Sequence, residues 1–83
     1  MKHFLVTGGA GFIGSNFIHY TLNNTKDIHI TNLDALTYAG NPENISDLEL
    51  DSRYKFIHGN INNPKLLGDI FQETPIDNII HFA

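Results

Sequence analysis

Glycines are concentrated in one short segment near the start of the chain. The run from Val6 to Gly14 reads Val-Thr-Gly-Gly-Ala-Gly-Phe-Ile-Gly and lies between an apolar stretch and a helix-like pattern. Glycine allows a sharp turn, a close approach of the backbone to a pyrophosphate and close packing of a helix. The helix that begins near Phe12 would also point its free N–H groups at the phosphates. This run therefore predicts a dinucleotide-binding loop.

Two registers of these glycines fit such a loop. Gly8, Gly11 and Gly14 are spaced three residues apart, as the sequence shows. Gly9 replaces Gly8 in the alternative G-x-G-x-x-G form. Because both registers are present, the glycines alone leave the subfamily open.

A carboxylate follows the second apolar run of the chain. Asp34 lies 20 positions after Gly14, where it can accept hydrogen bonds from the ribose hydroxyls of a dinucleotide. Asp34 would also repel a 2′-phosphate, and the next residue is Ala35, with no nearby Arg to bind that phosphate. We therefore expect NAD and not NADP. The alternative is a structural glycine turn followed by an ordinary surface Asp.

The other reactive residue types form no recognisable catalytic or metal-binding pattern. The five histidines lack H-x-x-x-H or comparable spacing and cysteine is absent, so we expect no metal site. Tyr38 and Tyr54 have no Lys four positions later, and the acidic side chains are interpreted as solvated charges. We expect no catalytic residue within this sequence.

Composition predicts one folded domain. The chain has 83 residues, of which 41% are hydrophobic and 17% are charged, and its net charge is −4. The negative balance argues against a nucleic-acid partner. No apolar run reaches membrane length and the first is too short for a signal peptide, so we expect neither a membrane partner nor export. With no cysteine, the cytoplasm is the expected location.

Short apolar runs alternate with helical patterns along the whole chain, which is typical of a parallel sheet covered by helices. We predict strands over residues 3–6, 28–33, 55–58 and 78–82. A helix is predicted from Phe12 to about Asn24, with a second from Pro64 that ends before Pro75 and is capped by Asn62 or Asn63. The first helix would bury one face, formed by Phe12, Ile13, Phe17, Ile18, Thr21 and Leu22. Residues 35–53 are less regular, with a loop over 38–42 and a short helix over 43–50.

The predicted fold class is α/β, the N-terminal part of a Rossmann-type doubly wound parallel sheet with strand order 3-2-1-4. Residues 1–83 would be a truncated NAD-binding domain without the second half of the sheet or a substrate domain. In this topology Asn60 and Ile61 lie at the adenine side of the carboxyl edge, and Phe82 and Ala83 border the nicotinamide side. The competing interpretation for Asn60 and Ile61 is a simple turn. For Phe82 and Ala83 it is packing in the apolar core.

The chain resembles the extended short-chain dehydrogenase/reductase family. The family loop T-G-x-x-G-x-x-G is matched from Thr7 to Gly14. The run from Leu33 to Asn41, Leu-Asp-Ala-Leu-Thr-Tyr-Ala-Gly-Asn, is more selective and resembles the nucleotide-sugar 4,6-dehydratases of that family, those acting on dTDP-glucose above all. The segments 53–56 and 59–61 continue this likeness.

The resemblance implies positions for the cofactor. Relatives usually carry Asp at the position of Asn60, so the negative charge is absent there in this chain. Many relatives carry Lys at the position of Ala35, so the side-chain contact of that Lys is lost. By position, the amides of Phe12 and Ile13 would meet the pyrophosphate. The remaining contacts would come from Asp34, Ala35, Leu36 and Thr37 around the adenosine ribose, and from Asn60, Ile61, Phe82 and Ala83.

The resemblance also implies a reaction for the parent protein. Hydride passes from C4 of the sugar to NAD, water leaves across C5 and C6, and the hydride returns to C6. Relatives use a Tyr-x-x-x-Lys pair, a Thr and an Asp-Glu pair that lie beyond residue 83, and the full-length protein is expected to be a homodimer. The alternatives are another nucleotide-sugar enzyme of the family, such as an epimerase, and a non-catalytic NAD-binding module.

Overall fold

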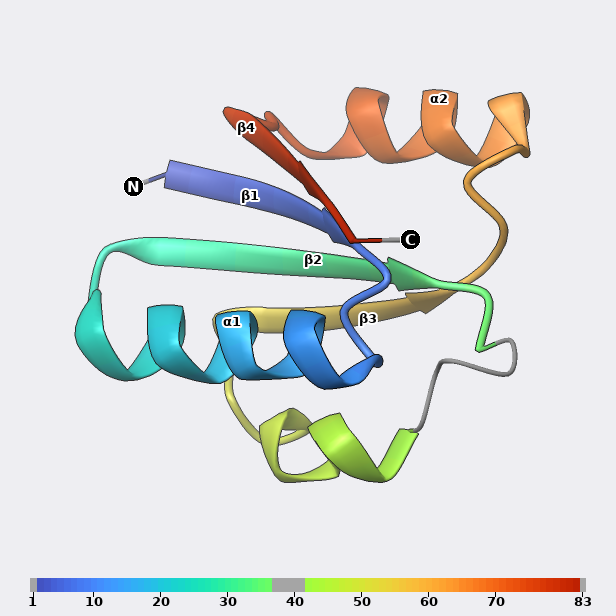
Figure 1. The fold of residues 1–83 in the computed structure, drawn as a ribbon. Helices are drawn as coiled ribbons and strands as arrows, with labels where there is room; N and C mark the ends of the chain where they lie inside the picture. Colours follow the sequence, from blue (N-terminus) through green and yellow to red (C-terminus); the bar gives the residue numbers. More distant parts are fainter. Residues whose placement is uncertain (1, 37–41, 83) are drawn as a thin grey trace.

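Strands and helices alternate along the chain, as Figure 1 shows for the computed structural model. The structure describes residues 2–36 and 42–82. Within these residues seven elements follow one another in this order: β1 (Lys2–Thr7), α1 (Phe12–Asn24), β2 (Ile28–Asp34), η1 (Pro42–Leu48, a 3-10 helix), β3 (Tyr54–His58), α2 (Pro64–Glu73) and β4 (Asn78–His81).

The four strands form one parallel sheet with the order β3-β2-β1-β4, which confirms the predicted topology. All four arrows in Figure 1 run in the same direction, so the strands end at a common edge. Thr7 pairs with Leu33 on one side and with His81 on the other, while Asp34 pairs with His58. This register brings the loops after β1, β2, β3 and β4 together.

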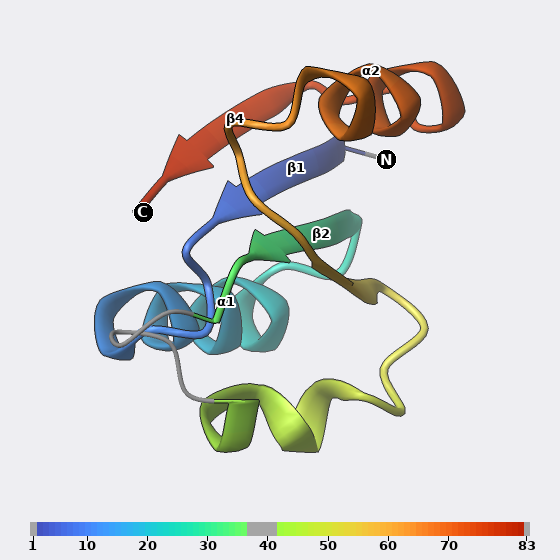
Figure 2. The same ribbon diagram turned by 90° about the vertical axis from the view of Figure 1, so that its right-hand side faces the viewer.

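Helices cover both faces of the sheet. Figure 2 shows α1 and η1 on one side and α2 on the other. Side chains alternate along a strand, so Val6 and Ile30 pack beneath α1 and η1, whereas Leu5 and Leu33 pack with Ile70 of α2. Strand β2, which lies between β3 and β1, is the most deeply buried strand, and His29 is its one residue that is partly exposed.

The predicted elements are confirmed with small shifts at their ends. Strand β4 ends at His81, one residue before the predicted end. Asn63 is the residue that caps α2, because its side-chain oxygen accepts a hydrogen bond from the N–H of Leu66 at 3.2 Å. The short helix after β2 is present as a 3-10 helix, and residues 38–41 of the predicted loop lie outside the described residues.

The predicted buried face of α1 was wrong at its first turn. Phe12 and Ile13 are 77% and 69% exposed, respectively. Phe12 lies about 200° around the helix from Gly14 because an α-helix has ~3.6 residues per turn, so the two cannot share a face. The buried stripe consists of Gly14, Ser15, Ile18, Thr21 and Leu22.

Candidate dinucleotide-binding site

The glycine loop connects β1 to α1 at the carboxyl edge of the sheet. Gly8 has a φ of 73°, in the left-handed region that glycine adopts without strain. Its N–H donates to the carbonyl of Leu33 at 3.0 Å, which anchors the turn to β2. A Cβ at Gly14 would lie 2.4 Å from the carbonyl oxygen of Gly8 and 2.8 Å from the Cα of Gly9. Gly14 therefore lets α1 approach the loop backbone, whereas a close contact of helix and strand was expected.

Gly9 is needed for a different reason. A Cβ at Gly9 would lie 2.4 Å from Oδ1 of Asn32 and 2.5 Å from Cδ1 of Ile18. Gly8 thus allows the left-handed backbone of the turn, and Gly9 leaves room for the side chains of Asn32 and Ile18. Both glycine registers left open by the sequence have a physical basis in the same loop.

Side chains from outside the loop hold its backbone in place. The N–H of Gly9 donates to Oδ1 of Asn32 at 3.0 Å, and the N–H of Ala10 donates to Oδ2 of Asp34 at 2.8 Å. On the other side, Nδ2 of Asn44 in η1 donates to the carbonyl of Ala10 at 2.9 Å. Asn32 and Asn44 were missed from the sequence. For Asn32, the available signal was a polar residue within the apolar run of β2. For Asn44, the sequence held no such signal.

The first turn of α1 is open to an anion. Gly11 is the N-cap, and among the described residues no side chain caps this end and no acidic residue lies in the first turn. The first N–H groups of a helix have no partner within the helix, and they carry the positive end of its dipole. Phe12 and Ile13, predicted to offer their amides here, belong to this turn. By contrast, α2 is closed by the side chain of Asn63.

Asp34 binds backbone amides on both sides. Its Oδ2 accepts from Ala10, and its Oδ1 accepts from the N–H of Leu36 at 2.8 Å. Leu36 has a φ of 54°, which is uncommon for a residue with a side chain. Asp34 as a whole residue is 8% exposed, and each carboxylate oxygen can accept a further hydrogen bond. Asp34 therefore joins the loop after β1 to the loop after β2, which sequence reasoning did not anticipate.

The segment after Asp34 lies beside the end of β3. The carbonyl of Ala35 is 3.1 Å from Nε2 of His58, and the N–H of Gly59 donates to the carbonyl of Asp34 at 3.1 Å. Ala35 thus lies beside His58, and the contacts predicted for Ala35 and Leu36 with the adenosine ribose stay a prediction. Thr37 lies outside the described residues.

Asn60 forms a turn after β3. Its Oδ1 accepts from the N–H of Asn62 at 2.8 Å, and its carbonyl accepts from the N–H of Asn63 at 3.0 Å. The turn interpretation therefore describes what this side chain does in the structure, and an adenine contact stays a prediction. Ile61 packs against the apolar cluster under α2.

The ends of β1 and β4 are joined at the same edge. Oγ1 of Thr7 hydrogen-bonds to Nδ1 of His81, and the N–H of Phe82 donates to the carbonyl of Thr7 at 2.8 Å. The Phe82 ring lies 5.4 Å from the ring of Phe17 and is 36% exposed. Phe82 therefore packs on α1 and also faces outward, while Ala83 lies outside the described residues.

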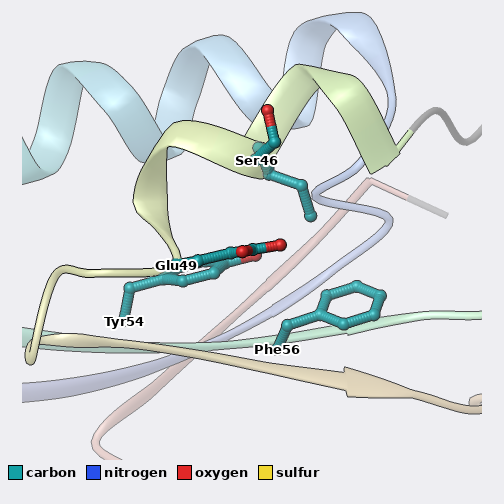
Figure 3. Close-up of a pocket in the computed structure, with 5 residues that line it drawn as sticks. Ser46, Glu49, Tyr54 and Phe56 are labelled. Carbon is teal, nitrogen blue, oxygen red and sulfur yellow. The ribbon is translucent and has the colours of Figure 1, made fainter.

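A small cavity lies apart from these loops, between η1 and β3. Figure 3 shows Glu49, which follows η1, lying over Tyr54 of β3, while the hydroxyl of Ser46 points away from Tyr54 and Phe56. With Ile45 they line a space of about 150 Å³, and none of the five belongs to the glycine loop. Burial raises the pKa of Tyr54 above its ordinary value, so its hydroxyl stays protonated at neutral pH.

The described part of the chain contains neither a metal-binding cluster nor a membrane-spanning helix. Within residues 2–36 and 42–82, no three His, Cys, Asp or Glu side chains are grouped so that they could hold a metal ion. Over the same ranges, no helix has the length and apolar character needed to cross a membrane.

The sheet order, the glycine loop between β1 and α1, and the carboxylate at the end of β2 define the class of protein: a Rossmann-type fold of the extended short-chain dehydrogenase/reductases. Residues 5–83 match the family model described as GDP-mannose 4,6 dehydratase. The chain belongs to the extended short-chain dehydrogenase/reductase family, and the resemblance seen in its sequence is confirmed.

Relatives of known function narrow the likeness. The chain is 47% identical over 79 residues to dTDP-glucose 4,6-dehydratase of Escherichia coli and 46% identical to that of Mycolicibacterium smegmatis. Each alignment covers 95% of this chain but only 22% and 23% of the respective relative. The chain thus spans less than a quarter of the length of these relatives, at their cofactor-binding region.

Solved structures agree with this comparison. The crystal structure of dTDP-glucose 4,6-dehydratase from Bacillus anthracis in complex with NAD superposes with a TM-score of 0.96 at 44% identity, covering 100% of this chain and 27% of that one. UDP-glucose 4-epimerase from Thermotoga maritima gives a TM-score of 0.80 at 30% identity, covering 98% and 24%.

Proposed function

We propose that residues 1–83 are the first half of the NAD-binding domain of a dTDP-glucose 4,6-dehydratase. The observation that carries this proposal is the uncapped first turn of α1, set beside the buried carboxylate of Asp34 by the glycine loop. It occurs in a chain 44–47% identical to enzymes of that name, one of them crystallised with NAD.

The residues present fit NAD. The missing side chain at Gly14 lets the first turn of α1 lie against the glycine loop, and the amides of Phe12 and Ile13 in that turn would bind the pyrophosphate. Asp34 would accept hydrogen bonds from the adenosine ribose, beside Ala35, Leu36 and Thr37. Asn60 and Ile61 would border the adenine, and Phe82 and Ala83 the nicotinamide.

When bound, NAD would take a hydride from C4 of the sugar and return it to C6 after water is eliminated across C5 and C6. The part of residues 1–83 in this reaction is to bind and orient the cofactor. Proton transfer belongs to residues elsewhere in the parent enzyme. We further propose a dTDP-sugar substrate, a homodimer and a cytoplasmic location for that enzyme.

A second candidate is a nucleotide-sugar 4-epimerase, favoured by the superposition on the Thermotoga maritima enzyme. The complete enzyme containing residues 1–83 should be incubated separately with dTDP-glucose and with UDP-glucose. A 4-keto-6-deoxy product from dTDP-glucose supports the dehydratase. Inversion at C4 of the UDP-sugar supports the epimerase, and NAD binding without turnover of either sugar supports a non-catalytic module.

Asp34→Ala in the complete enzyme should weaken NAD binding and narrow the preference for NAD over NADP. Hydrogen bonds to a charged group contribute about 1.5–3 kcal/mol, so the NAD dissociation constant should rise roughly 10- to 100-fold. Calorimetric titration with both cofactors measures the two effects. Asp34→Asn is the matched control, since it keeps the shape and removes the charge. Unchanged dissociation constants in Asp34→Ala would refute the role assigned to Asp34.

A further inference from the structure

Asn32 is a fully buried polar residue whose position the cofactor contacts do not explain. It lies on the central strand β2 with 0% of its surface exposed. Its Oδ1 accepts a hydrogen bond from the N–H of Gly9 at 3.0 Å, and its Nδ2 donates to the hydroxyl oxygen of Tyr54 at 3.1 Å. One amide thus connects the glycine loop to the outer strand β3.

The two contacts of Asn32 define its orientation. The backbone N–H of Gly9 can only donate, so the carbonyl oxygen of the amide must face the loop. The NH₂ group then faces Tyr54, whose oxygen accepts it. The phenolic oxygen of Tyr54 has lone pairs that accept this hydrogen bond.

Asn32 also limits how far the loop can move toward the sheet. A Cβ at Gly9 would lie 2.4 Å from Oδ1 of Asn32, so the loop backbone rests directly on this side chain. The next two residues lead into the open first turn of α1. A shift of the Gly9 backbone relative to the sheet would therefore move the amides of the first turn of α1, which would face the phosphates.

We propose that Asn32 is a positioning residue for dinucleotide binding, and that Tyr54 holds its amide in the required orientation. This inference rests on the proposed function. Neither side chain contacts the cofactor in this proposal, because both act through the backbone of Gly9. The partnership explains why a polar residue occupies the buried β2 and why Gly9 carries no side chain.

The test uses three variants of the complete enzyme. Asn32→Leu keeps the approximate volume and removes the acceptor for Gly9, and Tyr54→Phe keeps the ring and removes the acceptor for Asn32. We expect NAD dissociation constants about tenfold and about threefold higher, respectively, in titrations of the folded proteins. Asn32→Asp retains an oxygen facing Gly9 and should bind NAD more tightly than Asn32→Leu does.

A purely structural role is excluded by a matched control. Ile70→Val removes one methylene from the separate apolar cluster under α2, so it should lower the melting temperature and leave the NAD dissociation constant unchanged. Wild-type affinity in Tyr54→Phe, or in a folded Asn32→Leu, would overturn the inference and leave the proposed function intact. If Asn32→Leu does not fold, Tyr54→Phe decides. Failure of the wild type to bind NAD would instead overturn the proposed function.

Discussion

At the scale of single residues, the glycines of this chain have different structural roles. Gly8 adopts a backbone conformation that other residues avoid, and Gly9 and Gly14 leave room for neighbouring atoms. Gly68 in α2 has open space at this position, because, apart from its chain neighbours and the backbone of its own helix, no described atom lies within 4 Å of the Cβ it lacks. The sequence letter alone therefore does not distinguish a required glycine from a replaceable one.

This contrast predicts opposite effects of the same substitution. Gly14→Ala should destabilise the protein by about 1–3 kcal/mol, because the new Cβ meets backbone that cannot move aside easily. Gly68→Ala should stabilise it by about 0.5–1 kcal/mol, since alanine is the better helix former and the space is open. Urea unfolding of both variants beside the wild type measures the two changes. Equal destabilisation by both would contradict the assigned packing.

At the scale of elements, η1 is attached to α1 through a histidine. Nδ1 of His19 lies 2.7 Å from the carbonyl of Ser15, and Nε2 lies 2.9 Å from Oδ1 of Asp47 in η1. Both partners are acceptors, so this geometry suits an imidazolium that donates from both nitrogens. The hydrogen bond to Asp47 raises the pKa of His19, and the same contact lowers the pKa of Asp47.

The contact predicts a pH-dependent contribution to stability. Because the folded pKa of His19 is raised, its contribution is fully present below the ordinary value of 6.5 and is lost as the pH rises through the raised pKa. The lowered pKa of Asp47 removes the contribution again as the pH falls below 3.8. His19→Gln should therefore reduce the melting temperature most between these limits, and only slightly at pH 9. Asp47→Asn should give the same profile, and a pH-independent difference would contradict the ion pair.

At the scale of the whole molecule, burial is uneven across the sheet. The residues of β2 are almost all buried, whereas β4 lies at an edge and its Ile79 is 55% exposed. Phe71 of the neighbouring α2 is 46% exposed. The described residues thus surround the glycine loop on the side of β2 and β3 and leave the side of β4 open.

This arrangement predicts weak cofactor binding by residues 1–83 alone. A doubly wound sheet binds its dinucleotide across a crevice that normally needs both halves, and these residues span 22% of the Escherichia coli relative. We expect the 83-residue chain to bind NAD at least about tenfold more weakly than the complete enzyme, a difference of about 1.4 kcal/mol. Titration of both proteins under the same conditions tests this. Equal affinities would favour the non-catalytic NAD-binding module.

Much of the architecture was predictable because its signals are local. The alternation of apolar runs with helical periodicity predicts all four strands and both α-helices, and Pro64 and Asn63 mark the start of α2. The first turn of α1 misled the prediction because Phe12 and Ile13 are apolar but exposed. Residue type indicates a preference for burial, and it does not show which face of a helix meets the sheet.

The sequence by itself determined the fold class with its strand order, the glycine loop and the acidic residue at the end of β2, because the alternation of apolar runs with helical patterns and the spacing of Gly14 and Asp34 are local. Only the tertiary structure decided how these parts meet. It placed Asp34 between Ala10 and Leu36, and Asn32 between Gly9 and Tyr54. These contacts join residues more than 20 positions apart, or depend on a left-handed backbone at Leu36. Such partners depend on the register of packed strands, which no local pattern of residue types records.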